Sequence, residues 1–191
     1  MTDVRRRELI RLIAALTGAA FVGGRATRTA VAASVSPLYS DDEVRLFDDV
    51  AETIMPKTDT PGAREAGVGA FIARYSAARY EPAHIAILKD GVVQINARMR
   101  EAHGVEFVAA TAEQKQSLLT VIDRQAKQYV ATTDRSVHDH VPHYFTLLKQ
   151  LTLFGFFTSE LGASRVARYR PIPGKYKGCV PYTPGETFWA W

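Results

Sequence analysis

The chain of 191 residues contains one cysteine, Cys179, and this scarcity excludes several kinds of redox site. A single cysteine cannot form an intrachain disulfide. The sequence has neither a C-x-x-C-H haem-attachment motif nor the four cysteines that hold an iron–sulfur cluster. Any electron-carrying cofactor of a redox system would therefore not be built covalently onto this chain. Cys179 itself is interpreted as a small buried residue rather than a reactive thiol.

The sequence also lacks a membrane-length apolar run and the common catalytic motifs. The uncharged apolar stretch Leu12–Gly24 has 13 residues, fewer than the roughly 20 that a membrane-spanning helix needs. Neither a G-x-S-x-G nucleophile elbow nor a G-x-G-x-x-G fingerprint is present. The paired acids Asp48 and Asp49 are interpreted as part of a solvated helix face. The chain is therefore predicted not to be an enzyme.

The first 34 residues have the order of a twin-arginine export signal. Arg6 and Arg7 lie in a basic segment, Leu12–Gly24 is apolar, and Ala30–Ala32 offers the small-x-small pattern of a cleavage site. The twin-arginine pathway exports proteins that have already folded. We therefore expect recognition of Arg6 and Arg7 by the translocase and a periplasmic location. An ordinary buried first helix is the alternative, which the abrupt end of the apolar run at Arg25 disfavours.

The positive charge of the chain belongs to this leader. Of 24 basic and 20 acidic residues, six and two lie in residues 1–32, which leaves 18 of each sign in the rest. The remaining 159 residues are thus formally neutral, and nucleic acid is not an expected partner. They suffice for one domain with a sizeable core.

Hydrophobic periodicity predicts an all-α bundle of about five helices over residues 35–169. The helices are expected to begin near Ser40, Val68, Pro82, Thr111 and His138, and capping-box signatures mark the first and the fourth. The last, about His138–Ser159, is apolar nearly all round. Such a helix is either central or covered by a partner chain. Gly162, which follows it, is interpreted as a helix C-cap.

The tail over residues 170–191 combines turn-forming residues with aromatic ones. Four prolines and three glycines within residues 170–185 predict irregular structure. A disordered segment is usually poor in aromatic residues, whereas this tail is rich in them. We therefore expect it to be held against a surface, either of the bundle or of a partner.

The one cluster that suggests a metal site is formed by His138, His140 and His143. His140 and His143 are three residues apart and could share a helix face, and Asp139 could orient them. The polar N-terminus of a helix accounts for the same residues without a metal, and this is the default interpretation. A metal enzyme using the three histidines stays an alternative.

Two parts of the chain resemble a known family. Leu38–Glu43 opens a helix that ends at Pro56, and Pro61–Val68 follows it; later, Phe154–Gly162 is followed by Tyr169–Cys179. Together with the leader, these segments resemble the small subunit (gamma, or subunit 3) of the gluconate 2-dehydrogenase family. The resemblance covers nearly the whole chain, to about Pro184.

The resemblance implies an accessory role. Small subunits of this kind accompany a large FAD-dependent dehydrogenase of the glucose-methanol-choline type that oxidises sugars, sugar acids or glucosides. The large subunit lacks an export signal and leaves the cytoplasm bound to the small one, and a cytochrome c often accepts the electrons. FAD is expected on the partner. The resemblance implies no catalytic, cofactor-binding or metal-binding residue on this chain.

On this interpretation the last helix and the tail form the partner surface. The residues expected to contact the partner are Phe154, Phe156, Phe157, Tyr176, Tyr182, Phe188 and Trp189. For each of them, burial within its own domain is an alternative of equal weight. A periplasmic sugar-binding module, whose aromatic tail stacks on sugar rings, is a further alternative.

Overall fold

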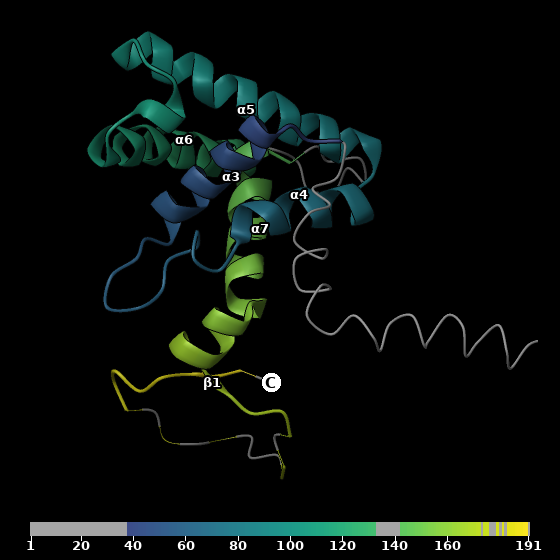
Figure 1. Cartoon of the computed structure of the whole chain (residues 1–191), viewed down its shortest axis with the longest axis vertical. Coiled ribbons are helices and arrows are strands. Elements are labelled where there is room, and N and C mark those ends of the chain that lie inside the picture. The colour runs from purple at the N-terminus through teal and green to yellow at the C-terminus, as the bar shows by residue number, and fades with distance from the viewer. Residues whose placement is uncertain are drawn as a thin grey trace, which may run out of the picture. The chain divides into compact units, whose positions relative to one another are not determined.

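The computed structural model describes residues 38–132, 142–172, 174–175, 179, 181 and 183–190. The predicted export signal with Arg6 and Arg7 lies outside the described residues, as do His138 and His140. The described part is mainly α-helical, which confirms the predicted fold class (Figure 1). Its elements are the α-helices α3 (Asp41–Ile54), α4 (Val68–Arg79), α5 (Pro82–His103), α6 (Ala112–Thr132) and α7 (Tyr144–Thr158), the short helices η1 (Phe107–Ala109) and η2 (Gly162–Val166), and the strands β1 (Arg168–Tyr169) and β2 (Trp189–Ala190).

Local capping chemistry explains where the helices begin. At the start of α3, the backbone N–H of Glu43 donates to Ser40 Oγ at 3.3 Å, and the Ser40 N–H donates to the Glu43 carboxylate at 2.7 Å. Thr111 and Gln114 make the same reciprocal pair before α6, at 3.3 and 2.9 Å. Each pair satisfies amide groups that have no partner inside the helix. Both predicted capping boxes are confirmed.

Helix α5 follows its predicted pattern closely. Pro82 lies in its first turn, where a missing N–H costs nothing. Gly104 ends it in the left-handed conformation, with φ of 73°. Gly91 faces α7, because a Cβ built there would lie 2.7 Å from Cδ2 of Tyr144. This glycine therefore lets the two helices approach closely at some cost in helix propensity.

Helix α7 is the central element of the bundle. It packs against α3, α4, α5 and α6, which cross it from different sides (Figure 1). Its buried side chains include Phe145, Leu148 and Leu151, each 2% exposed, and Thr152, which is fully buried and donates to the carbonyl oxygen of Leu148 at 2.8 Å. Packing against four helices accounts for apolar residues on most sides of α7, although Leu153 and Phe154 are exposed.

Two predictions in the chain's C-terminal part are corrected. Gly162 is not a C-cap but the first residue of the π-helical turn η2, buried where a Cβ would collide with the carbonyl oxygen of Phe156. Cys179 is exposed rather than buried. Near its end, the tail adds the strand β2, which runs parallel to β1 with Trp189 opposite Arg168.

Candidate functional site

An aromatic cluster lies on the outer side of the contact between α4 and α7. The rings of Phe71 and Tyr75 stack at a centroid distance of 5.3 Å. The ring of Phe154 meets both edge-on, at 5.6 and 5.3 Å. Phe154 is nevertheless 45% exposed. We call Phe71, Tyr75 and Phe154 the α4–α7 aromatic cluster.

The α4–α7 aromatic cluster depends on a glycine between two phenylalanines. Gly155 is buried, and a Cβ built there would lie 2.5 Å from Cδ1 of Phe71. The absence of a side chain at Gly155 therefore lets the Phe71 ring lie directly on the α7 backbone. Phe154 packs on that ring from the next position along α7, which keeps a large apolar side chain at the surface in a defined place.

A second aromatic group lies at the C-terminal sheet. Phe157, at the end of α7, meets Phe188 edge-on at 5.6 Å, although Phe188 is 51% exposed. The next residue, Trp189, is 47% exposed, and the guanidinium groups of Arg168 and Arg170 lie over its ring at 5.3 and 5.8 Å. We call Phe157, Phe188 and Trp189 the C-terminal aromatic cluster. Exposed aromatic rings beside arginine are the commonest composition of strong protein–protein contacts.

The structure separates the seven predicted interface residues. Phe156 is 1% exposed and belongs to the core, so it is not available at the surface. Because an α-helix turns by about 100° per residue, Phe154 and Phe156 lie on nearly opposite sides of α7. Phe154, Phe188 and Trp189 are exposed and Phe157 is half-buried, whereas Tyr176 and Tyr182 lie outside the described residues.

Sequence reasoning missed Phe71 and Tyr75 as surface residues. Both are half-buried and expose part of their rings, and neither was named as a candidate contact residue. Their spacing of four residues is the signal that could have found them. Residues i and i+4 of a helix are neighbours on one face, and two aromatic residues at this spacing form a stacked pair.

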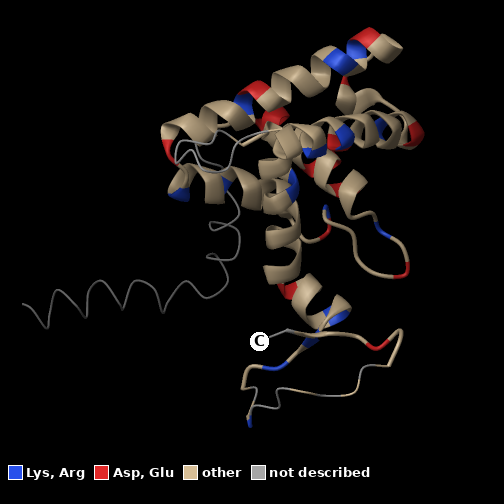
Figure 2. Ribbon diagram, turned by 180° about the vertical axis from the view of Figure 1, so that it is seen from behind, with Lys and Arg blue, Asp and Glu red and all other residues tan. Residues whose placement is uncertain are grey.

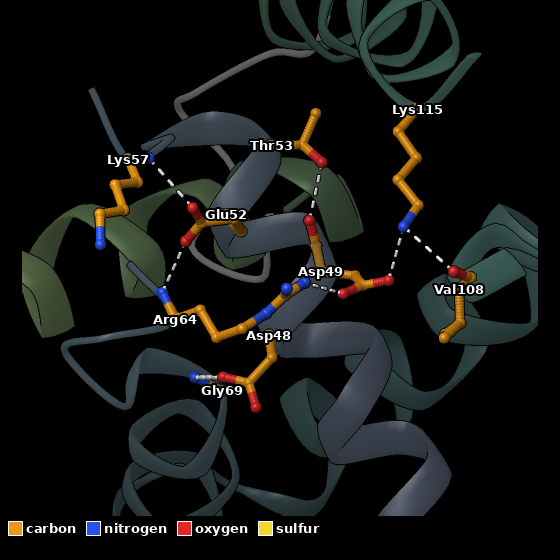
Figure 3. A network of polar contacts seen from close by, with 9 residues as sticks. All are labelled: Asp48, Asp49, Glu52, Thr53, Lys57, Arg64, Gly69, Val108 and Lys115. Atoms are coloured by element: carbon orange, nitrogen blue, oxygen red, sulfur yellow. Dashed lines mark hydrogen bonds and ion pairs between the residues drawn. The ribbon is translucent and has the colours of Figure 1, made fainter. Parts of the chain in front are cut away.

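A polar network fixes the chain between α3 and α4 (Figure 3). The carboxylate of Asp49 bridges the guanidinium of Arg64 and Nζ of Lys115, the latter at 2.7 Å. The Glu52 carboxylate accepts from the backbone N–H groups of Lys57 and Arg64, at 3.0 and 2.8 Å. Asp49 is 8% exposed, so its interpretation as part of a solvated face was wrong.

Asp48 extends this network to the start of α4. Its carboxylate accepts from the backbone N–H of Gly69 at 2.8 Å, one of the orphan donors of a helix N-terminus. Burial raises the pKa of the Asp48 carboxyl, and the Gly69 hydrogen bond opposes this shift. Acidic side chains of α3 therefore orient α4, the helix that carries Phe71 and Tyr75. The network has a positioning role for the α4–α7 aromatic cluster.

His143 has a structural role at the start of α7, which begins at Tyr144 and not near His138 as predicted, because His143 is extended and caps the helix. Its Nδ1 accepts from the backbone N–H of Phe145 at 3.2 Å, and its ring stacks on Tyr144 at 4.5 Å. Burial lowers the pKa of the His143 imidazole. His138 and His140 lie outside the described residues, so the structure does not test the metal hypothesis there. Among the residues that are described, no three His, Cys, Asp or Glu side chains are grouped to hold a metal ion.

The His143 cap predicts a pH-dependent stability. The imidazole pKa of His143 is lower in the folded state than in the unfolded state. Between these two pKa values the unfolded state binds more protons, so the protein loses stability as the pH falls below about 6.5. We expect urea unfolding at pH of about 5.5 to show a loss of no more than ~1 kcal/mol relative to about 7.5, because one pH unit below the ordinary pKa limits a single imidazole to about 1.4 kcal/mol and solvent screens this partly exposed ring. A His143→Asn variant, which caps without titrating, should lose less. Equal pH dependence in both proteins would contradict the assignment.

The fold and the two clusters define a small all-helical protein with exposed aromatic surfaces. None of the described helices is both long and apolar enough to cross a membrane. The sequence profile of gluconate 2-dehydrogenase subunit 3 matches residues 41–174. The chain belongs to this family, which confirms the resemblance and indicates an accessory subunit that assembles with a dehydrogenase. Searches of curated proteins and of solved structures found no match.

Proposed function

We propose that the chain is the non-catalytic small subunit of a periplasmic complex whose large subunit is an FAD-dependent dehydrogenase of the glucose-methanol-choline type. The large subunit oxidises a sugar, a sugar acid or a glucoside and carries the flavin. The small subunit stabilises it and supplies the twin-arginine signal that exports the folded pair. A cytochrome c is the proposed electron acceptor.

The observation that carries this proposal is the exposure of large aromatic side chains in a member of a subunit family. Phe154, Phe188 and Trp189 are 45%, 51% and 47% exposed, and each is held in place by neighbouring rings or cations. Permanent complexes bury roughly 2,000 Å² or more of combined surface, with aromatic anchors near the centre. The two aromatic clusters are suited to that role.

The contact surface proposed here differs from the sequence-based one at three positions. Phe156 is removed because it is part of the core, and Phe71 and Tyr75 are added because they support Phe154. These aromatic surfaces offer apolar contact, ring stacking and cation–π interactions. Such contacts suit the binding of a protein surface.

One experiment tests both the export of the chain and its assembly with a flavoprotein. The tagged chain is purified gently from the periplasm and the cytoplasm of its native host, and the eluates are examined by absorption spectroscopy. We expect the periplasmic eluate to contain a larger flavoprotein with a flavin spectrum. With Arg6→Lys and Arg7→Lys combined, both proteins should stay in the cytoplasm, because the translocase requires the arginine pair.

Two results would contradict different parts of the proposal. A solitary, colourless protein from wild-type cells would remove the assembly with a flavoprotein. Flavoprotein activity that still reaches the periplasm with the Arg6→Lys, Arg7→Lys variant would leave the complex intact but show that this leader does not export the partner.

A further inference from the structure

Charge is distributed unevenly along the part of the chain that follows the leader. Residues 38–132 contain eleven basic and fourteen acidic residues, whereas residues 160–191 contain five basic and only two acidic ones. The neutral total therefore conceals a basic C-terminal segment. Figure 2 shows blue segments along the described part of this region, around β1 and the chain that follows it.

The described cations of this segment are mostly not neutralised within the chain. Arg168 pairs with Glu186 at 2.9 Å. Arg165, Arg170 and Lys175 are exposed, and no carboxylate of the described residues lies within ion-pair distance of them. An exposed cation beside an aromatic ring is available to a partner at little cost in desolvation.

The register of the β-sheet gathers two of these cations on one ring. Arg168 and Arg170 are two residues apart, so their side chains leave the extended chain on the same face. Trp189 lies opposite Arg168 in the β1–β2 pair. Both guanidinium groups therefore lie over the Trp189 ring, at 5.3 and 5.8 Å. Glu186 neutralises one of the two, and the charge of Arg170 is left facing outward with that of Lys175.

We infer that Arg168, Arg170, Lys175 and Trp189, here called the C-terminal basic surface, bind a carboxylate-rich surface of the dehydrogenase partner. The inference rests on the proposed function. The planar fork of a guanidinium matches a carboxylate with two parallel hydrogen bonds. A partner carboxylate would also relieve the repulsion between two cations held on one ring. The apolar rings of Phe188 and Trp189 beside them provide the contact area that an ion pair alone lacks.

A protein surface fits these cations better than a membrane does. Membrane-surface binding uses amphipathic helices with many basic residues on one polar face. Here Arg168 lies in a two-residue strand and Arg170 directly follows it, and Arg168 is already paired with Glu186. The family match also indicates a protein partner. Binding of anionic lipid by these cations, in place of the flavoprotein, would overturn the inference.

The test measures the affinity of the full chain for the flavoprotein with which it co-purifies. The wild type is compared with Arg170→Glu and Lys175→Glu, and with Arg124→Glu as a matched control, since Arg124 is an exposed cation on α6. Far-UV circular dichroism checks the fold of each variant. Each titration is run at ionic strengths of about 0.1 M and about 1 M, where the Debye length is about 10 and about 3 Å.

At low salt, we expect Arg170→Glu and Lys175→Glu each to weaken binding of the flavoprotein about tenfold or more, because the new glutamate would face carboxylates of the partner. The difference should shrink at high salt, and Arg124→Glu should bind like the wild type. A complex that forms equally well with all four proteins at both salt concentrations would overturn the inference and leave the proposed function standing. Lys175 is exposed and makes no ion pair with the described residues, so its variant keeps the test valid if Arg170→Glu misfolds.

Two further outcomes would also overturn the inference. In the first, the wild-type chain binds vesicles of equal parts phosphatidylglycerol and phosphatidylcholine, Arg170→Glu does not, and both bind the flavoprotein equally. The C-terminal basic surface would then bind a membrane. If the wild-type chain binds no flavoprotein at all, the proposed function fails, and the inference fails with it.

Discussion

Phe156→Ala is expected to lower the free energy of unfolding by about 3–5 kcal/mol, whereas Phe154→Ala, two residues away, should lower it by only about 1–2 kcal/mol, chiefly through its lost ring contacts. Phe156 is 1% exposed and Phe154 is 45% exposed. Truncating the first leaves a cavity in the core beside α7. Truncating the second removes a ring that still faces solvent on one side. Urea denaturation of the purified chain measures both values.

The same two variants should rank in the opposite order for partner binding. If Phe154 anchors the partner, Phe154→Ala should weaken the complex by about 2 kcal/mol or more, which corresponds to about thirtyfold in Kd. Titration of the flavoprotein partner with each folded variant measures this. A stable Phe154→Ala protein that binds like the wild type would remove Phe154 from the contact surface. Comparable stability losses in both variants would contradict the division between core and surface.

Asp49→Ala is expected to cost about 3 kcal/mol of stability, because it breaks a buried ion pair and leaves one partner behind. Asp49 is 8% exposed, and the Lys115 side chain that it binds at 2.7 Å is 14% exposed. Lys115 would keep its hydrogen bond to the carbonyl oxygen of Val108, at 3.1 Å, and its cation–π contact with the Phe107 ring, at 5.6 Å. The broken ion pair with Arg64 contributes less to this loss of stability, because the Arg64 side chain is 56% exposed.

A second acidic residue of α3 provides the control. Asp42 pairs with Arg45 at 2.7 Å, but the Asp42 side chain is 88% exposed, so Asp42→Ala should change stability by no more than about 1 kcal/mol. Asp49→Leu combined with Lys115→Met should recover much of the loss, because no unpaired charge stays buried. Equal effects of Asp49→Ala and Asp42→Ala in urea unfolding would show that the network does not stabilise the fold.

The loss of Asp49 should also reach the α4–α7 aromatic cluster. The network of Asp48, Asp49 and Glu52 holds the chain that leads into α4. If that chain loosens, the stacked pair of Phe71 and Tyr75 loses its fixed position against Phe154. Asp49→Ala should therefore lower the stability of the fold and, through α4, also weaken the partner contact that Phe154 makes.

The helices could be predicted because their signals are local. The capping box of Ser40 and Glu43 spans three residues, and the stripe of α5 repeats every three or four. Interactions over such distances form in the same way in almost any tertiary context. The boundaries of α3, α4 and α5 accordingly agree with the predicted ones within a residue or two.

The candidate site could be predicted only in part. The sequence indicated that α7 and the tail hold unusually many aromatic residues, but it could not separate Phe154 from Phe156. Their separation depends on which side of α7 each of the surrounding helices covers. The half-buried positions of Phe71 and Tyr75 likewise depend on how α4 packs against α7, which no local pattern fixes.

The sequence by itself determined the helical class, the starts of α3, α4, α5 and α6 and the family, because capping, periodicity and motif order act over a few residues. The tertiary structure alone decided which aromatic rings are exposed and which acid is buried. It also paired Arg168 with Trp189. Asp49 and Lys115 are 66 residues apart and the two strand partners are 21 apart. Contacts at such separations exist only after the bundle has packed, since their geometry depends on every helix between them.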